Sequence, residues 1–445
     1  MSESPKKIRL AIIGAGIAGL TAAIALQDQP HIDVQIYERA RQLREVGATI
    51  ALGPNGLRIL DKLGVANALS DDVGFRNRTG RSMIYRHYQT DEDVSSDVPQ
   101  GPVEYKHQTA RFFRPHLQRV LLDHIQQGRL HLGKAFESIV KDNSTDDVTV
   151  KFRDGSTAKA DIVLGADGIH SAVRRTFVPG SSAKWTGHVF FRTVVPRTHY
   201  QHIEGLPDEA VHYWAPDRTL FLSPLPRGLY AVVAAHQCDP DDPDQPYLQA
   251  EWDQNVNIAS LRPLYKDWSP LTRRILDATP FIKVYPNTAA KELDSWILGR
   301  GRVTLAGDAA HAHGGAFAAG GSLAIDDSWA FAQSVLHHFP ASGDWRVSLD
   351  DSGVSKVLAL YERTRKAHTD RVQRTVQQRN RFLVDQIKTK QTDEELRHKM
   401  RSRGDLAWVH EHDVEAAFTR AKLELDQPEE ASVQPGFQQR EQSRL

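Results

Sequence analysis

Residues 8–38 read IRLAIIGAGIAGLTAAIALQDQPHIDVQIYE. The opening IRLAIIG is a continuous apolar run rich in β-branched residues, which is typical of a strand buried on both faces. The small residues of GAGIAGLTAAIALQ predict a tight turn into a helix, and DVQIYE predicts a second strand. A helix that joins two parallel strands makes a right-handed crossover. The stretch therefore predicts a parallel sheet with helices packed against it.

The glycines of this turn and one carboxylate favour a bound dinucleotide. Gly14 permits the tight turn, Gly16 lets backbone N–H groups approach a pyrophosphate, and Gly19 permits close packing of helix on strand. The pyrophosphate would lie at the positive end of the helix dipole. Glu38 ends the second strand, where its carboxylate can accept hydrogen bonds from a ribose. The motif alone does not separate NAD from FAD.

A second glycine-flanked turn occurs in DIVLGADGIHS, residues 161–171, which is followed by Arg174. The apolar run predicts a buried strand, and the strand ends in a turn that carries Asp167. From the residues alone, a purely structural turn explains this pattern as well as a ligand-binding turn does.

A third such segment, residues 303–327, reads VTLAGDAAHAHGGAFAAGGSLAIDD. Its strand ends at Asp308, and an Asp at the carboxyl end of a parallel strand faces the crevice where such sheets bind ligands. Ser322 is a candidate cap for the helix that follows, whose first N–H groups favour negative charge. The glycines that would let the main chain pass close to a flat ligand are Gly314, Gly315, Gly320 and Gly321.

The rest of the chain predicts a second sheet and a helical end. Residues 185–236 contain the alternating segments VFFRTVVP, AVHYWAPD, TLFLSPLP and LYAVVAAH, which predict a separate antiparallel sheet. From Tyr361 onward the chain is charged, and YERTRKAHTDRVQRTVQQRNRF predicts a long polar helix.

The composition limits the partners of the chain. It has 445 residues, 40% hydrophobic and 25% charged, which is enough interior for two or three domains. Its 56 basic and 56 acidic residues cancel, so we expect no nucleic-acid partner. No apolar run is long enough to span a membrane. Cys238 is the only cysteine, so no internal disulfide can form, and no cluster has the spacing of a metal site.

In their order and spacing, the glycine-rich segments resemble those of the single-component (group A) FAD-dependent aromatic hydroxylases, and most of all the fungal salicylate hydroxylase-like monooxygenases. The resemblance extends over roughly residues 8–415. The segments that carry it besides the turns are REVGA at 44–48, RPHL at 114–117, YER at 361–363 and WVHEHD at 408–413.

The resemblance implies an α/β fold: a Rossmann-like FAD-binding domain of the glutathione reductase type, an inserted antiparallel-sheet substrate domain and a helical C-terminal region. We expect the FAD-binding domain in residues 1–80, 105–180 and 285–360. The substrate domain would comprise residues 81–104 and 181–284. Residues 361–425 would form the helical region, and residues 426–445 a disordered tail.

The resemblance also implies a tightly but non-covalently bound FAD, with NADH or NADPH as co-substrate. The glycine-rich loop that follows Asp308 would lie beside the flavin ring. The residues that the resemblance assigns to the cofactor are Gly14, Gly16, Gly19, Glu38, Arg44, Ala48, Arg114, Asp167, Asp308, Gly320 and Gly321.

By the same resemblance, NAD(P)H reduces FAD, O2 adds at flavin C4a, and the hydroperoxide transfers an oxygen atom to a phenolic or salicylate-like ring. A phenol reacts more readily as it loses its proton, so we expect a cation or a base near its oxygen. The candidate catalytic residues are Arg192, His212 and Tyr213. We expect Arg192 on the strand face opposite to its neighbours Phe190 and Phe191.

The loop departs from the family pattern in one place. Many salicylate hydroxylases carry Pro-His-Gln where this chain has Gly315-Ala316-Phe317, which argues against salicylate itself as the substrate. An alternative is an FAD-dependent epoxidase or oxidase that acts on a non-aromatic secondary metabolite. A flavin-free NAD-binding protein is a further alternative, and the second and third turns argue against it.

The last residues, Ser443-Arg444-Leu445, resemble the Ser-Lys-Leu peroxisomal address. The preceding segment is polar and rich in Pro and Gln, so we expect it to be disordered and accessible to an import receptor. We therefore expect the protein in the cytoplasm or the peroxisomal matrix, as a monomer or a homodimer.

Overall fold

The computed structural model describes residues 7–43, 48–141, 147–242, 247, 250–343, 345, 349–387, 389 and 391–426. Arg44 and the Ser443-Arg444-Leu445 tail lie outside these residues, so the expectations for them stay predictions. Among the described residues, no helix combines the length and apolar character needed to cross a bilayer.

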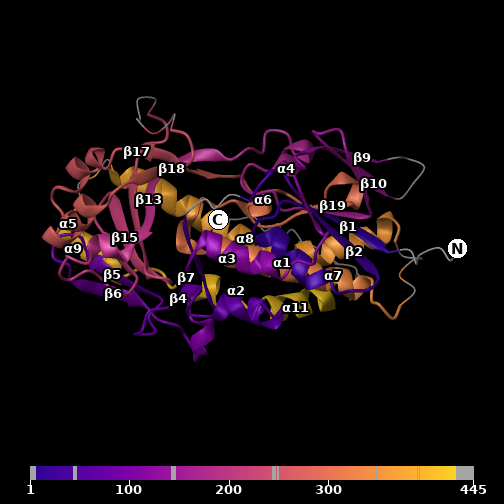
Figure 1. Ribbon diagram of the computed structural model, residues 1–445, viewed down its shortest axis with the longest axis horizontal. Helices are drawn as coiled ribbons and strands as arrows, with labels where there is room; N and C mark the ends of the chain where they lie inside the picture. The colour runs from indigo at the N-terminus through magenta and orange to yellow at the C-terminus, as the bar shows by residue number, and fades with distance from the viewer. Residues whose placement is uncertain are drawn as a thin grey trace, which may run out of the picture.

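A parallel sheet forms one half of the molecule (Figure 1). β1 pairs with β2 on one side and with β12 on the other, and α1 (Ile17–Leu26) connects β1 to β2. The βαβ unit predicted from residues 8–38 is therefore confirmed. In their order across the sheet, the strands are β19 (Val303–Leu305), β12 (Ile162–Gly165), β1 (Ile8–Ile13), β2 (Ile32–Glu38) and β8 (Leu130–Leu132).

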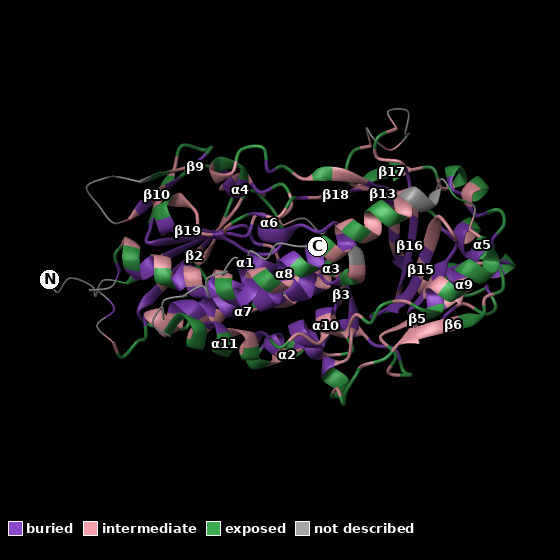
Figure 2. Cartoon of the chain, turned by 180° about the vertical axis from the view of Figure 1, so that it is seen from behind, coloured by how far each residue is buried: buried purple, intermediate pink, exposed green. Residues whose placement is uncertain are grey.

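Helices α1 and α7 (Gly320–His338) pack against this sheet and are buried along most of their length (Figure 2). Two smaller sheets complete this half of the molecule. One has the order β11 (Thr157–Ala160), β10 (Val148–Phe152) and β9 (Phe136–Lys141), and the other β3 (Thr49–Leu52), β7 (Ala110–Phe113) and β4 (Gly74–Phe75).

An eight-stranded sheet forms the other half of the molecule. It is antiparallel except for the pair β14–β5, which is parallel. One of its faces packs into a second hydrophobic core with α5 (Pro270–Ala278). In order, the strands are β17 (Gln254–Val256), β18 (Ile282–Ala289), β13 (Lys184–Pro196), β16 (Leu229–Gln237), β15 (Arg218–Leu225), β14 (Val211–Trp214), β5 (Met83–His87) and β6 (Asp93–Asp97).

The predicted long polar helix is present, but it begins earlier, since α8 spans Asp351–Ile387. The other α-helices are α2 (Pro54–Lys62), α3 (Arg114–Asp123), α4 (Ala172–Phe177), α6 (Asp308–His311), α9 (Asp393–Arg401), α10 (Ala407–His410) and α11 (Val414–Asp426). Short 3-10 helices are η1 (Ala66–Leu69), η2 (Tyr105–His107), η3 (Arg197–Tyr200), η4 (Ile258–Ser260), η5 (Arg262–Tyr265), η6 (Gly299–Gly301) and η7 (Ala316–Ala318).

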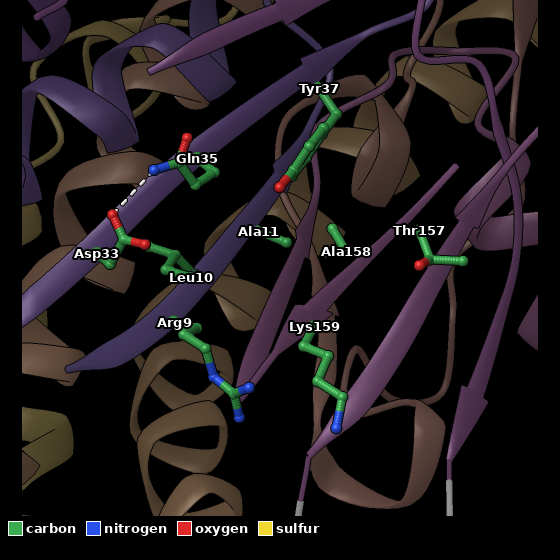
Figure 3. Close-up of a pocket in the computed structure, with 9 residues that line it drawn as sticks. All are labelled: Arg9, Leu10, Ala11, Asp33, Gln35, Tyr37, Thr157, Ala158 and Lys159. Carbon is green, nitrogen blue, oxygen red and sulfur yellow. Dashed lines mark hydrogen bonds between the residues drawn. The ribbon is translucent and has the colours of Figure 1, made fainter. Parts of the chain in front are cut away.

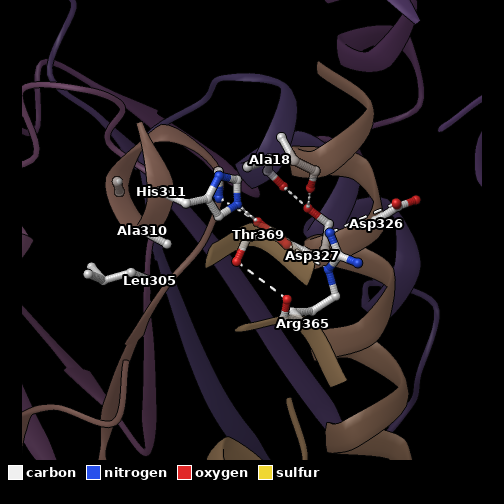
Figure 4. A network of polar contacts seen from close by, with 12 residues as sticks. Ala18, Leu305, Ala310, His311, Asp326, Asp327, Arg365 and Thr369 are labelled. Atoms are coloured by element: carbon white, nitrogen blue, oxygen red, sulfur yellow. Dashed lines mark hydrogen bonds and ion pairs between the residues drawn. The ribbon is translucent and has the colours of Figure 1, made fainter. Parts of the chain in front are cut away.

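A buried polar network joins α7, α8 and the turn after β19 (Figure 4). The Asp327 carboxylate accepts hydrogen bonds from the Gly307 backbone N–H at 2.8 Å and from His311 Nε2 at 2.5 Å. It also accepts one from Arg365 Nε at 2.8 Å. Burial alone would raise the pKa of Asp327, but the adjacent His311 and Arg365 lower it to about 2. Asp327 therefore stays ionised at every physiological pH.

The neighbouring carboxylate behaves in the opposite way. Asp326 is fully buried and accepts a hydrogen bond from Asn55 Nδ2 at 2.9 Å. Burial raises the pKa of Asp326 to about 7, although Arg365 and Asn55 act against this rise. The folded chain thus holds a proton on Asp326 at pH values where the unfolded chain has lost it.

This pKa predicts a pH-dependent effect of Asp326→Asn. In the wild type, the stability that comes from the protonated carboxyl is present at low pH and is lost as the pH rises through about 7. The neutral amide does not titrate. The variant should therefore gain free energy of unfolding relative to the wild type between pH 5 and pH 8, by an amount on the order of 2 kcal/mol. Denaturant unfolding at both pH values measures the difference.

Asp123→Asn is the matched control, because Asp123 is an exposed carboxylate in an ion pair with Arg119. The effect of Asp123→Asn on the free energy of unfolding should be the same at pH 5 and pH 8. An equal effect of Asp326→Asn at the two pH values would contradict the raised pKa of Asp326.

Candidate active site

The three glycine-rich turns meet at one edge of the parallel sheet. They follow β1, β12 and β19, which are adjacent strands with their carboxyl ends on the same side. Gly14 has φ +108°, and a Cβ built on it would lie 2.5 Å from the carbonyl oxygen of Ala166. The first two turns therefore touch, and no other residue fits at Gly14.

The other two glycines of the first turn differ in what surrounds them. A Cβ on Gly19 would lie 2.0 Å from the Gly14 carbonyl oxygen, so Gly19 serves close packing of α1. Around Gly16, a Cβ would meet nothing within 4 Å. An open space at the amino end of a buried helix is what a bound diphosphate requires. The turn therefore fits the ADP part of FAD.

Glu38, the last residue of β2, stabilises the first glycine-rich turn through hydrogen bonds. Its carboxylate accepts hydrogen bonds from the backbone N–H groups of Ala15, at 2.9 Å, and Ala40, at 2.8 Å. Two other predicted cofactor residues contact each other, since the Arg114 backbone N–H donates a hydrogen bond to the Ala48 carbonyl at 2.9 Å. Arg114 begins α3, and its side chain is exposed.

Asp167 is engaged with the helix that follows it. Its carboxylate accepts hydrogen bonds from Ser171 Oγ at 2.5 Å and from the N–H groups of Ala172, at 2.6 Å, and Val173, at 3.2 Å. Burial raises the pKa of Asp167, and these hydrogen bonds oppose the rise. The structure gives Asp167 a role in starting α4, and its proposed place beside a nucleotide stays a prediction.

The third turn presents Asp308 toward the start of α7. Asp308 is exposed, and a Cβ on Gly320 would lie 3.9 Å from its Oδ1 atom. Gly321 instead serves packing, because a Cβ there would lie 2.7 Å from Leu52. The cap predicted at Ser322 is wrong: α7 has no side-chain cap, and Ser322 Oγ accepts a hydrogen bond from the Gly53 N–H at 2.9 Å.

The loop between Asp308 and α7 has a strained backbone that the sequence did not reveal. Phe317 has φ +61° and Ala318 has φ +53°, values that side-chain-bearing residues seldom adopt. Each of these left-handed backbone conformations costs on the order of 1 kcal/mol of stability. The Phe317 ring lies 5.5 Å from the guanidinium carbon of Arg379 on α8, so the loop contacts a helix absent from the predicted site.

The large sheet presents two of the predicted catalytic residues on one face. Arg192 lies opposite Val233, Val233 opposite Phe221, and Phe221 opposite His212, so Arg192 and His212 share a row across the strands. We call this the inner face of the sheet. Tyr213 points to the other face, where it is buried in the second core. Its hydroxyl oxygen accepts a hydrogen bond from Arg86 Nη1 at 3.3 Å. The structure therefore does not bring Tyr213 together with the other two.

Arg192 lies among aromatic rings on the inner face. Its guanidinium carbon is 4.6 Å from the Phe190 ring and 5.3 Å from the Tyr285 ring. The expectation that Arg192 and Phe190 lie on opposite faces is wrong, because residues two apart in a strand share a face. No carboxylate among the described residues pairs with Arg192. Burial lowers its pKa to about 10, and the positive charge of Arg114 contributes.

The histidines of the inner face are neutral. Burial lowers the pKa of His188 and of His212 to about 3, and the charge of Arg379 is the next cause in both. Neither ring is a cation at physiological pH.

A cavity of about 220 Å³ lies elsewhere, between β1, β2 and β11 (Figure 3). Its charged lining residues include Arg9, Asp33 and Lys159, and Arg9 is paired with Asp161 and Asp147. None of the glycine-rich turns lines it, and ligands of such sheets bind at the carboxyl ends of the strands. We assign this cavity no part in the site.

The glycine geometry predicts opposite outcomes for two alanine variants. Gly16 has φ −80°, so Gly16→Ala should fold with an unfolding temperature within a few degrees of the wild type. Its added methyl group would occupy the open space, and flavin affinity should fall at least tenfold. Gly19→Ala should lose roughly 2 kcal/mol of stability or more, because its methyl group meets the main chain. Visible absorbance of bound flavin and thermal unfolding separate the two effects. Normal flavin binding by Gly16→Ala would contradict the assignment of this turn.

Comparisons with known proteins agree with this geometry. A 6-hydroxynicotinate 3-monooxygenase of Bordetella bronchiseptica is 30% identical over 383 residues, which is 83% of this chain and 90% of that protein. A salicylate hydroxylase of Pseudomonas putida is 26% identical over 448 residues, 95% of this chain and 97% of that protein. Both organisms are bacteria, so the fungal part of the resemblance stays a prediction.

The fold agrees with a solved structure of a salicylate hydroxylase substrate complex, at a TM-score of 0.76 and 22% identity, over 94% of this chain and 98% of that chain. Residues 7–376 match the family model described as FAD binding domain. This match and the relative at 30% identity show that the chain belongs to the FAD-binding domain family.

Proposed function

We propose that this FAD-dependent monooxygenase hydroxylates a small phenolic compound, with NADH or NADPH and O2 as co-substrates. The named relatives are hydroxylases or monooxygenases of hydroxylated aromatic acids, which supports aromatic hydroxylation over an epoxidase or oxidase of non-aromatic compounds. The state of the protein as a monomer or a homodimer stays a prediction from the sequence.

The residues of the three turns fit FAD. The open space at Gly16 would accept the diphosphate. Glu38 ends β2 and Asp308 begins α6 just after β19, which are positions where carboxylates can bind hydroxyl groups. When bound, FAD supplies the redox chemistry that activates O2 at the expense of NAD(P)H. The uncapped start of α7 would present backbone N–H groups to the cofactor and favour negative charge there.

The observation that carries the proposal is the environment of Arg192. Its charge has no carboxylate partner among the described residues, and its guanidinium lies over the Phe190 and Tyr285 rings on the inner face. A phenol beside such a cation ionises more readily, because the positive charge stabilises the phenolate. An ionised phenol is a stronger nucleophile toward an electrophilic oxygen. Arg192 would therefore hold and activate the phenolic oxygen.

A panel of phenols and hydroxybenzoates tests the function. We expect at least one compound to stimulate NAD(P)H oxidation and to give a hydroxylated product that contains one oxygen atom from labelled O2. Mass spectrometry measures this incorporation. If no compound of the panel yields a labelled product, aromatic hydroxylation is contradicted.

Arg192→Gln tests the proposed role of the guanidinium. It should lower kcat/KM for the phenol by about 100-fold, the range expected for a buried charge-assisted contact. The bound-flavin spectrum should stay unchanged, and Arg192→Lys should recover part of the activity. Lys184→Gln is the matched control, since Lys184 is an exposed cation on the same strand. Wild-type kcat/KM in Arg192→Gln would remove Arg192 from the site.

A further inference from the structure

Helix α8 carries a cation onto the inner face of the large sheet. The helix runs from the parallel-sheet half of the molecule to the eight-stranded sheet (Figures 1 and 2) and contacts β16. The guanidinium carbon of Arg379 lies 5.6 Å from the Trp214 ring and 5.5 Å from the Phe317 ring. Trp214 belongs to β14 and Phe317 to the glycine-rich loop. Arg379 therefore lies between the sheet and the loop proposed to border the flavin.

The charge of Arg379 has no carboxylate partner among the described residues. Its guanidinium contacts the Trp214 and Phe317 rings, and Tyr85 is also within electrostatic range. The neighbouring Arg403, by contrast, pairs with Asp97. Burial lowers the pKa of Arg379, and Arg403 lowers it further. Arg379 is partly exposed, and a cation held against two aromatic rings without a counter-ion favours a bound anion.

His212 lies against the same indole ring and is fixed in one tautomer. Trp214 Nε1 donates a hydrogen bond to His212 Nδ1 at 3.2 Å. An indole N–H can only donate, so His212 Nδ1 carries no proton, and in a neutral ring the proton is on Nε2. No described residue accepts a hydrogen bond from Nε2. His212 is therefore a hydrogen-bond donor toward a ligand, and it is not a base.

We propose that Arg379 and His212 bind a carboxylate group of the aromatic substrate, and that Trp214 is a positioning residue that sets the His212 tautomer. The proposal rests on the proposed function, since it names the substrate group. A carboxylate only accepts hydrogen bonds, which complements a site built from a guanidinium and an imidazole N–H. The faces of Trp214 and Phe317 limit water around the ion pair and so strengthen it.

Binding of benzoate and benzamide to the FAD-loaded enzyme tests the carboxylate site. The two probes have nearly the same shape and differ in charge. We expect the wild type to bind benzoate at least tenfold more tightly, as measured by calorimetry and by perturbation of the flavin spectrum. Arg379→Gln should lose this preference, and Arg379→Lys should keep part of it. Arg381→Gln is the matched control, because Arg381 is an exposed cation on the same helix; it should keep the full preference.

Equal affinity of the wild type for the two probes, or an unchanged preference in Arg379→Gln, would overturn the proposal. Benzoate has no hydroxyl group, and its binding is read without turnover. A benzoate preference that depends on Arg379, in an enzyme that hydroxylates no phenol, would therefore overturn the proposed function while the anion site stands.

Nitrogen NMR of histidine-labelled enzyme tests the tautomer without relying on an Arg379 variant. The His212 signals, identified by their loss in His212→Gln, should show a protonated Nε2 and an unprotonated Nδ1 at neutral pH. Trp214→Phe removes the indole donor, so the tautomers should mix and KM for a hydroxybenzoate should rise more than kcat falls. A charged His212 in the wild type, or one protonated on Nδ1 alone, would overturn the role of Trp214.

Discussion

The buried carboxylate of Asp327 is the contact on which the geometry of the site depends. It accepts hydrogen bonds from the Gly307 backbone, His311 and Arg365, so one charge joins the turn after β19 to α7 and α8. A buried ion with all its partners in place resists displacement, because the loss of any partner leaves a charge unsatisfied in a low-dielectric interior. The contact therefore fixes the turn that carries Asp308 and the part of α8 that carries Arg365. Arg379 follows fourteen positions later, about four helical turns along a rigid rod.

The two halves of the site balance their charges differently. Beside α7, the cation of Arg365 is matched by a carboxylate. On the inner face of the large sheet, Arg192 and Arg379 have no acidic partner among the described residues. Asp97 forms an ion pair with Arg403, and Asp253 forms one with Lys283. The excess positive charge draws anions toward the sheet, and it adds to the burial that keeps His188 and His212 neutral. The same positive charge thus favours anionic ligands and disfavours protonation of the inner-face histidines.

The parts of the site that follow from local backbone rules could be predicted from the sequence. The glycine turns after β1, β12 and β19 belong to this group, because a tight turn at the end of a strand is decided within a few residues. The directions of the side chains on the large sheet were harder to predict from the sequence. His212 and Tyr213 must face opposite ways, but which of them faces inward depends on pairing across several strands. Arg379 could not be found, because its neighbours Trp214 and Phe317 are distant in sequence and nothing local to α8 marks it.

The parallel pairing of β14 with β5 has a consequence for how this protein can be divided. β5 and β6 come from residues 83–97, whereas the rest of the large sheet comes from residues 184–289. A fragment of the later segment alone would leave β14 as an open edge strand with unpaired backbone groups, which invites aggregation. It would also separate Trp214 from Tyr85, whose rings lie 5.4 Å apart. Chimeras that exchange the sheet with a relative must therefore transplant both segments together.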